Sequence, residues 1–251
     1  MDLGLRDRAY ILTGASGGLG LATAQALVAD GARVVISSRT AASVDAAVAA
    51  LGENAVGVAA DNADPSTPDR LVAAAREAFG RLDGALISVG GPPAGSILDT
   101  TDEQWTAAFN SVFLGSLRLA RTVAAELSDG GSIAFVLSTS AKMPVAGLAI
   151  SNGLRPGLAM AAKTMADELG PRGIRVNGLL PGRVDTDRVQ HLDSLAPDPV
   201  AARASHEAAI PLRRYGTPDE FGHVAAFVLS PAASFLTGVM LPIDGGLTRS
   251  L

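Results

Sequence analysis

The sequence predicts an α/β fold in which helices flank a doubly wound, seven-stranded parallel sheet. Short apolar runs typical of strands alternate with alanine-rich stretches in which apolar residues recur at three- and four-residue steps. The strand-like runs are apolar throughout, as expected for strands that are covered on both faces. No segment rich in proline, serine or glycine interrupts this alternation, so we expect one domain over residues 1–251.

The expected elements follow one another along the chain. The expected strands are Ala9–Leu12, Val34–Ser37, Ala55–Ala59, Ala85–Ser88, Ile133–Leu137, Arg175–Leu180 and Met240–Ile243. The expected helices are Leu19–Asp30, Ala41–Leu51, Thr67–Phe79, Asp102–Leu127, Ala149–Gly170 and Pro218–Leu229. Thr217 with Glu220 and, more weakly, Thr101 with Gln104 have the spacing of a capping box at a helix start. Residues 183–211 are the least regular stretch, and we interpret them as a mobile lid or substrate loop.

Composition and charge exclude several classes of function. The formal net charge is −5 without runs of like charge, which argues against a nucleic-acid partner and against a polybasic membrane surface. The chain has no cysteine, so disulfide bonds and thiolate metal sites are excluded. No secretion signal is visible, and the apolar stretches are shorter than the about 18 residues of a membrane helix. We therefore expect a soluble cytoplasmic protein.

A glycine-rich loop, Thr13–Gly20, lies between the first expected strand and the first expected helix. Glycine permits a tight turn and a close approach of the backbone to a pyrophosphate, and the free N–H groups of the helix start face the anion. The loop therefore predicts a dinucleotide site. The alternative is a turn without a ligand.

The end of the second expected strand predicts which dinucleotide is bound. Ser38 stands where a carboxylate would accept hydrogen bonds from the ribose of NAD, and Arg39 follows it. A hydroxyl and a fixed cation favour a 2′-phosphate, so we expect NADP(H). The alternative is that Arg39 is a solvated surface charge.

Several motifs occur in an order that resembles the short-chain dehydrogenase/reductase superfamily. They are Thr13–Gly20, Asp61, Asn110, Ser138, Gly170–Asn177, Pro181-Gly182 and Thr237–Gly246. The resemblance covers nearly the whole chain, and within the superfamily it is closest to the β-ketoacyl-acyl-carrier-protein reductases. It implies a Rossmann fold, a nicotinamide cofactor and a small-molecule carbonyl or acyl thioester substrate. Because the segment that matches residues 235–246 usually lies in a subunit interface, it also implies a homotetramer or homodimer.

The resemblance implies roles for single residues. Those that would hold the cofactor are Gly14, Ser16, Gly18, Leu19 and Gly20 at the pyrophosphate and adenosine, Asp61 and Asn62 at the adenine, Gly90 and Gly91 at the wall of the site, and Pro181-Gly182-Arg183-Val184 with Thr186 at the nicotinamide carboxamide. Asn110 would anchor a helix kink and a water. Ser138 would donate a hydrogen bond to the substrate carbonyl.

The sequence departs from the family at the catalytic Tyr-x-x-x-Lys, whose positions hold Ser151 and Arg155. In the family the tyrosine donates a proton to the carbonyl oxygen, and an aliphatic hydroxyl is a much weaker acid than a phenol. Ser151 and Arg155 are one helical turn apart on a shared face, so a modified site of Ser138, Ser151, Arg155 and Asn110 is expected. In it Arg155 would hold positive charge near the developing alkoxide, and water would supply the proton.

Other residues are weaker candidates for the missing acid. Tyr10 and Tyr215 belong to the first strand and to the segment before the last helix, Lys142 to a loop, and His191 and His206 to the lid. A serine hydrolase is disfavoured, because the sequence lacks a Gly-x-Ser-x-Gly elbow with a histidine partner. Two hypotheses remain. The first is an NADP(H)-dependent oxidoreductase of the 3-oxoacyl-reductase type. The second is a nucleotide-binding module that has lost the catalytic chemistry and acts as a sensor or assembly partner.

Overall fold

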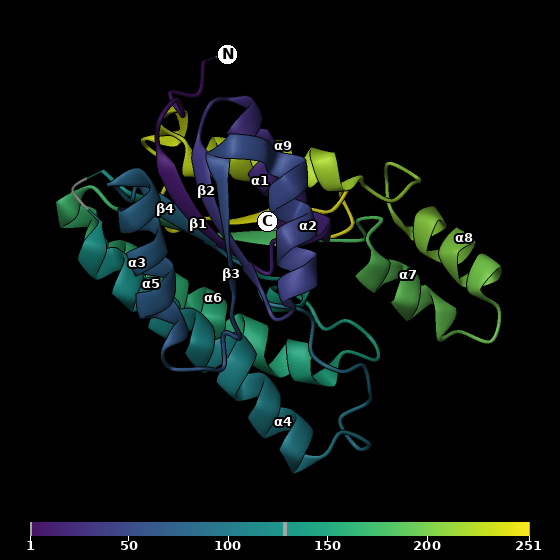
Figure 1. The fold of residues 1–251 in the computed structure, drawn as a ribbon. Coiled ribbons are helices and arrows are strands. Elements are labelled where there is room, and N and C mark those ends of the chain that lie inside the picture. The colour runs from purple at the N-terminus through teal and green to yellow at the C-terminus, as the bar shows by residue number, and fades with distance from the viewer. Residues whose placement is uncertain (1, 128–129, 251) are drawn as a thin grey trace.

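Seven parallel strands form one sheet in the order β3-β2-β1-β4-β5-β6-β7 (Figure 1). The computed structural model describes residues 2–127 and 130–250, so the expected domain of residues 1–251 includes four residues, 1, 128, 129 and 251, that lie outside the described part. The strands are β1 (Ala9–Thr13), β2 (Arg33–Ser38), β3 (Ala55–Ala59), β4 (Gly84–Ile87), β5 (Ser132–Val136), β6 (Arg175–Pro181) and β7 (Met240–Ile243). The predicted doubly wound sheet is confirmed, and every expected strand ends within one residue of the observed one.

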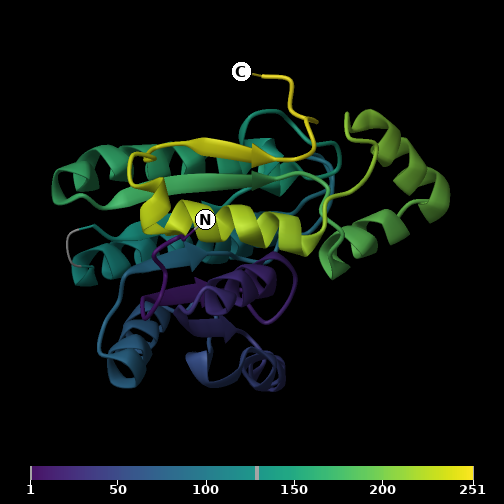
Figure 2. The same ribbon diagram turned by 90° about the horizontal axis from the view of Figure 1, so that it is seen from above.

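Helices cover both faces of the sheet (Figures 1 and 2). On one face lie α1 (Gly18–Ala29), α2 (Ala41–Leu51) and α9 (Pro218–Leu229), and on the other lie α3 (Thr67–Phe79), α5 (Gly115–Glu126) and α6 (Ala149–Leu169). Successive residues of β1 point to opposite faces, so Tyr10 and Leu12 belong to the first core and Ile11 to the second. This double burial explains why the strands are apolar throughout. None of the described helices combines the length and the apolar character needed to cross a bilayer.

The expected helix Asp102–Leu127 is divided in the structure. It consists of α4 (Asp102–Ala108), a π-helical stretch (Phe109–Leu114) and α5, with the predicted capping box at Thr101 in place. The N–H of Gly115 donates to the carbonyl of Asn110, five residues earlier. A Cβ at Gly115 would collide with the backbone carbonyl of Asn62, so glycine lets this bend pack against the loop after β3.

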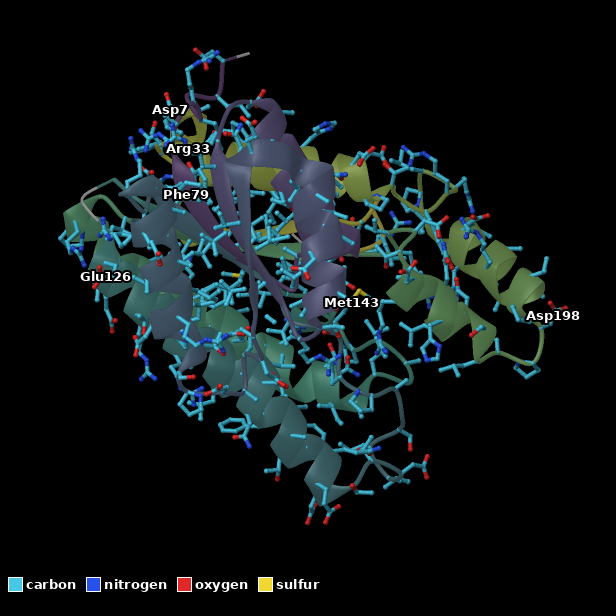
Figure 3. All side chains as sticks on the ribbon, in the orientation of Figure 1. Asp7, Arg33, Phe79, Glu126, Met143 and Asp198 are labelled. Carbon is cyan, nitrogen blue, oxygen red and sulfur yellow. The ribbon has the colours of Figure 1, made fainter. Side chains whose placement is uncertain are left out.

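Residues 183–211, which we call the lid, are more regular than expected, and their role as a mobile lid or substrate loop stays a prediction. They contain α7 (Asp187–Ser194) and α8 (Pro199–Ala209), which project beyond the layered core (Figure 1). The Thr186 side chain accepts a hydrogen bond from the N–H of Val189 at the start of α7. Asp198, at the far end of the lid (Figure 3), does the same for Ala201 at the start of α8, where Pro199 takes the first helical position. Proline therefore starts a helix here and does not mark a loop.

The sheet topology creates a crevice where the loops after β1 and β4 separate to opposite faces. This reversal of strand order is the place where α/β sheets bind ligands. The two loops are joined, because the Thr13 hydroxyl donates to the Ser88 carbonyl (2.7 Å) and accepts from the Ser88 N–H (3.0 Å). The glycine loop that opens α1 is thereby held against the loop that follows β4.

Candidate active site

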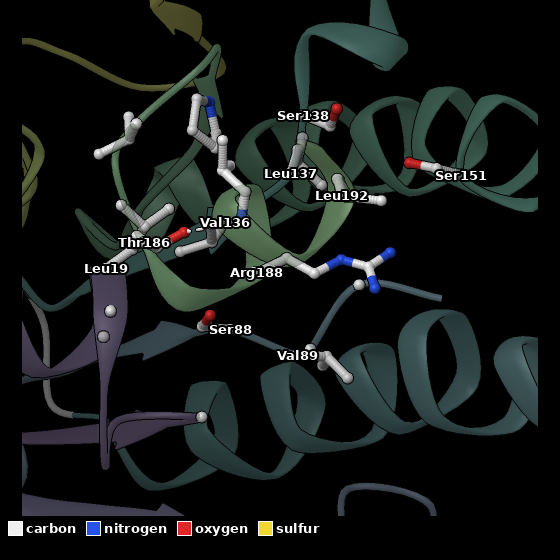
Figure 4. A pocket seen from close by; sticks show the side chains of 18 of the residues that line it. Leu19, Ser88, Val89, Val136, Leu137, Ser138, Ser151, Thr186, Arg188 and Leu192 are labelled. Atoms are coloured by element: carbon white, nitrogen blue, oxygen red, sulfur yellow. Dashed lines mark hydrogen bonds between the residues drawn. The ribbon is translucent and has the colours of Figure 1, made fainter. Parts of the chain in front are cut away.

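A cavity of about 380 Å³ lies at the carboxyl ends of β1, β4, β5 and β6, beneath α7 (Figure 4). Both groups of residues predicted for the site contribute to it. From the predicted cofactor residues these are Gly14, Gly18, Leu19, Gly20, Gly90, Gly91, Pro181, Gly182, Val184 and Thr186, and from the predicted catalytic residues Ser138, Ser151 and Arg155. The fold thus brings the glycine loop and the three polar side chains to one hollow.

The glycines of the cavity differ in what surrounds them. Gly14 has a φ of +58°, and a Cβ there would lie 2.9 Å from the Ser88 carbonyl oxygen. At Gly20 a Cβ would lie 2.5 Å from the Gly14 carbonyl oxygen. At Gly17 and Gly90, in contrast, a Cβ would meet no atom within 4 Å. The first two positions need glycine for packing, whereas the other two expose bare backbone to open space, an arrangement that fits a pyrophosphate group lying against the start of α1.

The residues predicted to bind the adenosine end lie outside this cavity. They are Ser16, Ser38, Arg39, Asp61 and Asn62. The Asn62 amide donates to the Thr13 hydroxyl (3.4 Å) and so connects the loop after β3 with the glycine loop. Arg39 is exposed at the carboxyl end of β2 and forms no ion pair within the described residues. Its side chain is therefore available to an anion beyond the edge of the cavity.

Three serines connect the end of β5 with α6. The Ser138 Oγ accepts a hydrogen bond from the N–H of Ser140 (3.1 Å), which fixes the turn after the strand. The Ser140 Oγ lies 2.9 Å from the Ser151 Oγ, and both side chains are buried. Ser140 was missed by the sequence analysis, although the run of three hydroxyl residues, Ser138-Thr139-Ser140, is a signal that could have found it. Ser151 thus has a hydroxyl partner on the side away from the cavity lining.

Arg155 is a buried cation that forms no ion pair with any described residue. It follows Ser151 by one turn of α6 and is 4% exposed. Its Nη1 donates to the Val136 carbonyl of β5 (2.7 Å), while its Nε is buried without a partner among the described residues. Burial lowers the pKa of Arg155 to about 10, so the side chain keeps its charge at neutral pH. An orphaned Nε beside a cavity fits a ligand oxygen, such as a ribose hydroxyl of a bound dinucleotide.

The remaining predicted candidates do not reach the cavity. Asn110 falls in the π-helical stretch and is exposed. The side chains of Tyr10, Tyr215, Lys142, His191 and His206 do not line the cavity either. Within residues 2–127 and 130–250, no group of three or more His, Asp and Glu side chains is placed to hold a metal ion.

A polar cluster fastens the lid. The buried Asp193 of α7 accepts hydrogen bonds from Arg183 Nη1 (2.5 Å) and from the Tyr215 hydroxyl (2.9 Å). The Nε2 of His206 in α8 lies 2.9 Å from Arg183 Nη2 and accepts its hydrogen bond, because a guanidinium can only donate. The Nδ1 of His206 then donates to the Tyr215 hydroxyl (3.2 Å), and a ring with one accepting nitrogen is neutral. Burial, assisted by the Arg183 charge, lowers the pKa of His206, and burial raises the pKa of Tyr215 to about 12. The lid helices are thus tied to the segment that precedes α9.

Arg188 reaches from α7 into the cavity (Figure 4). Its Nη2 donates to the Pro92 carbonyl (2.6 Å), and its guanidinium covers Gly91, where a Cβ would lie 2.9 Å from the Nε. Burial lowers the pKa of Arg188 from its usual value. The sequence analysis did not single out this residue, and no sequence signal marks it, because only the folded lid brings α7 to the loop after β4.

Comparison with known proteins gives related sequences over the full length. A family model described as enoyl-(acyl carrier protein) reductase matches residues 14–248. An uncharacterized oxidoreductase of Mycobacterium tuberculosis is 38% identical, with 97% of this chain and 93% of that protein covered. A protein of Streptomyces virginiae named as a ketoacyl reductase of the monensin polyketide synthase is 34% identical, with 96% and 97% covered.

Solved structures share the whole architecture. A short-chain dehydrogenase/reductase from Brucella melitensis, of the glucose/ribitol dehydrogenase type, superposes with a TM-score of 0.93 at 29% identity and 100% coverage of both chains. The L-sorbose reductase of Gluconobacter frateurii, solved with NADPH and L-sorbose, superposes with a TM-score of 0.94 at 28% identity, also over 100% of both chains.

Proposed function

The chain belongs to the short-chain dehydrogenase/reductase superfamily of oxidoreductases, and on this basis we propose that it uses NADP(H) to reduce the carbonyl group of a ketone or 3-oxoacyl compound. One observation carries the proposal. The cavity that is bordered by the open backbone of the glycine loop is also lined by Ser138, Ser151 and Arg155. The relative from Streptomyces virginiae, named as a ketoacyl reductase, supports this substrate class.

The cofactor would lie along the carboxyl edge of the sheet. Gly17, where a Cβ would meet no atom within 4 Å, would leave room for the pyrophosphate at the start of α1, and Thr186 would lie at the nicotinamide carboxamide. Arg39, exposed and unpaired within the described residues, would approach a 2′-phosphate, and Ser38 brings no negative charge to repel it. The Gluconobacter frateurii structure, which holds NADPH, supports this choice of dinucleotide.

When bound, NADPH would supply a hydride to the carbonyl carbon and leave as NADP⁺, while a proton from water completes the hydroxyl group. Ser138 would donate its hydroxyl proton as a hydrogen bond to the carbonyl oxygen, because its own oxygen already accepts from the Ser140 N–H. Ser151 would act as a second donor when Ser140 donates to it across the 2.9 Å contact. Neither serine is acidic enough to give up its proton, so both would orient the substrate and the water.

Arg155 would stabilise the charge that develops on the carbonyl oxygen. The guanidinium is held by the Val136 carbonyl and shielded from solvent, so its field is weakened little by water. It cannot exchange a proton as lysine can. We therefore expect turnover that is slower than with a tyrosine donor.

The proposed assembly is a homodimer or homotetramer formed along the β7 edge of the sheet. β7 pairs only with β6 among the described strands, and the Phe235 side chain just before it is fully exposed. An exposed aromatic side chain beside an unpaired strand edge is typical of a subunit contact.

Two measurements test the function. A fluorescence titration should show that NADPH binds, and NADPH absorbance should fall when acetoacetyl thioesters or a panel of ketones are added. Ser138→Ala should slow turnover and leave NADPH affinity unchanged, whereas Arg121→Ala, a substitution on α5 away from the cavity, should change neither. Failure of the wild type to bind NADPH would overturn the proposal.

A nucleotide-binding module without catalysis is the second candidate. It is favoured by the cavity lining, which among the described residues contains neither a tyrosine nor a lysine. Tight NADPH binding without consumption of any carbonyl compound would support the module in place of the reductase.

A further inference from the structure

The Arg188 guanidinium has donors that the protein does not use. Within the described residues only its Nη2 has an acceptor, the Pro92 carbonyl, which leaves the donors of Nε and Nη1 without one. In Figure 4 the side chain extends from α7 into the space between the segments that carry Ser151 and Val89. The guanidinium therefore faces the part of the cavity in which the carbonyl of a substrate would lie beside Ser151.

The charges around this cavity are unbalanced. Arg188 forms no ion pair with any described residue, and neither does the buried Arg155, which also lines the cavity. Asp187 is the single acidic side chain among the described lining residues, and it is exposed. Much of the remaining wall is apolar, formed by residues such as Leu148 and Leu192. Two partly dehydrated cations without counterions are unfavourable, and an anion between them would relieve the cost.

The size of the cavity limits where this anion comes from. A volume of about 380 Å³ is near the lower end of ligand pockets, about 300–1,000 Å³, and it includes the glycine loop. The pyrophosphate of the dinucleotide would lie at the glycine loop, so an anion that meets Arg188 beside Ser151 (Figure 4) would belong to the same small molecule as the reacting carbonyl. A carboxylate matches the planar donor geometry of a guanidinium.

We propose that the substrate is a small oxo acid, whose carboxylate is bound by Arg188 while its carbonyl lies beside Ser138 and Ser151. This assignment rests on the proposed oxidoreductase function and adds the substrate class. It also gives the lid a role, because Arg188 is carried by α7 and the cluster around Asp193 fixes that helix.

The alternative is that Arg188 only fastens the lid to the loop after β4 through Pro92. A fastening role would affect every substrate equally, whereas recognition of a carboxylate affects only anionic substrates. Acetoacetate and its neutral ethyl ester carry the same ketone and therefore form a matched pair of probes.

The test compares Arg188→Met and Arg188→Lys with the wild type on both probes at saturating NADPH. For Arg188→Met we expect kcat/KM for acetoacetate to fall about 10- to 100-fold, as for loss of hydrogen bonds to a charged group, with little change for the ester. Arg188→Lys should recover part of the loss, because it keeps the charge without the planar geometry. Asp187→Asn should leave the KM for acetoacetate unchanged or lower it. Equal losses on acid and ester would overturn the proposal in favour of a fastening role.

A binding measurement decides the question if no turnover is seen. Calorimetric titration of 3-hydroxybutanoate and of its methyl ester into protein saturated with NADP⁺ should show that the acid binds the wild type more tightly than the ester does. Arg188→Met should abolish that preference, and NADPH affinity should be the same in both proteins. If the wild type binds NADPH but has no preference for the acid, the oxo-acid assignment fails and the reductase proposal stands. If NADPH does not bind, the reductase proposal fails. The acid and the ester are then titrated without dinucleotide: tighter binding of the acid supports the carboxylate site, and equal binding of the two overturns it.

Discussion

The double substitution Ser151→Tyr with Arg155→Lys should raise the rate of carbonyl reduction. Ser151 is 6% exposed and lines the cavity, so a phenol at this position would extend into the space beside Ser138. A cation one helical turn away lowers the pKa of a phenol from about 10. A positioned general acid raises the rate of the chemical step by about 10²- to 10⁴-fold, which corresponds to lowering the activation barrier by about 3–5 kcal/mol.

The same substitution also has a cost in stability. Placing a phenol at a buried position costs about 1–3 kcal/mol, and the lost Ser140–Ser151 hydrogen bond adds about 1 kcal/mol. A domain of ordinary stability, about 5–15 kcal/mol, tolerates this sum. We therefore expect a folded variant that is less stable and more active than the wild type.

The matched control is Ser151→Phe with Arg155→Lys, which has the ring and the lysine but no hydroxyl group. Single-turnover rates should be measured with prebound NADPH and a saturating ketone, so that changes in cofactor affinity do not enter. Circular dichroism should show that both variants are folded. A tyrosine variant no faster than the phenylalanine variant would refute the placement of residue 151 beside the carbonyl.

Three further predictions concern the glycine loop, the cofactor and the lid. Gly20→Ala should lower the free energy of unfolding by about 1–3 kcal/mol and weaken NADPH binding, because its Cβ would lie 2.5 Å from the Gly14 carbonyl oxygen. Gly17→Ala, which meets no atom within 4 Å, should leave stability unchanged, and equal urea midpoints for the two variants would contradict this packing argument. Arg39→Asp should reduce NADPH affinity by about 10- to 100-fold with little effect on NADH, and unchanged NADPH affinity in a fluorescence titration would remove the 2′-phosphate assignment. Because burial lowers the pKa of His206, the unfolded chain binds more protons than the folded one below about pH 6.5, and the free energy of unfolding falls as the pH drops. His206→Gln should therefore lose less stability than the wild type between about pH 7 and pH 5.5. If the urea midpoints of the two proteins shift equally over that range, His206 is not neutral in the folded state.

The sheet could be predicted from the sequence because its strands are covered on both faces. Such strands are continuous apolar runs, and the seven expected runs match the seven observed strands. The break in residues 102–127 could not be predicted from periodicity, because one wide turn hardly disturbs the recurrence of apolar residues. Where the π-helical stretch ends, Gly115 packs against the Asn62 backbone, which is remote in sequence. The lid helices were missed because residues 183–211 were interpreted as an irregular stretch, although Asp198-Pro199 is a favourable helix start.

The candidate site was predictable only where a motif is local. The glycine loop is one continuous motif between a strand and a helix. The resemblance singled out Ser151 and Arg155, and their spacing of one helical turn placed them on one face. Arg188 belongs to the site through an approach of α7 to the loop after β4, and residues 92 and 188 are joined by a single hydrogen bond. Ser140 was missed although it lies only two residues after Ser138, because its contact is with Ser151 of α6, eleven residues further along the chain.

If Ser151 and Arg155 stand in place of the family's tyrosine and lysine, as the resemblance implies, the cavity loses its acid but keeps one cation. Arg155 remains charged at neutral pH and forms no ion pair with any described residue, so the cavity without a bound anion is electrostatically unfavourable. Arg188 adds a second cation, and both costs diminish when an anion enters. Reduction of an oxo acid leaves its carboxylate unchanged. The hydroxy-acid product therefore keeps the same attraction to the two cations as the substrate. We therefore expect release of the hydroxy acid from Arg188 to limit turnover once a tyrosine donor accelerates the chemical step. Rapid-mixing experiments on the tyrosine variant should then show a burst of NADPH oxidation with acetoacetate and none with its ethyl ester, and a burst of equal size with both probes would place the limiting step elsewhere.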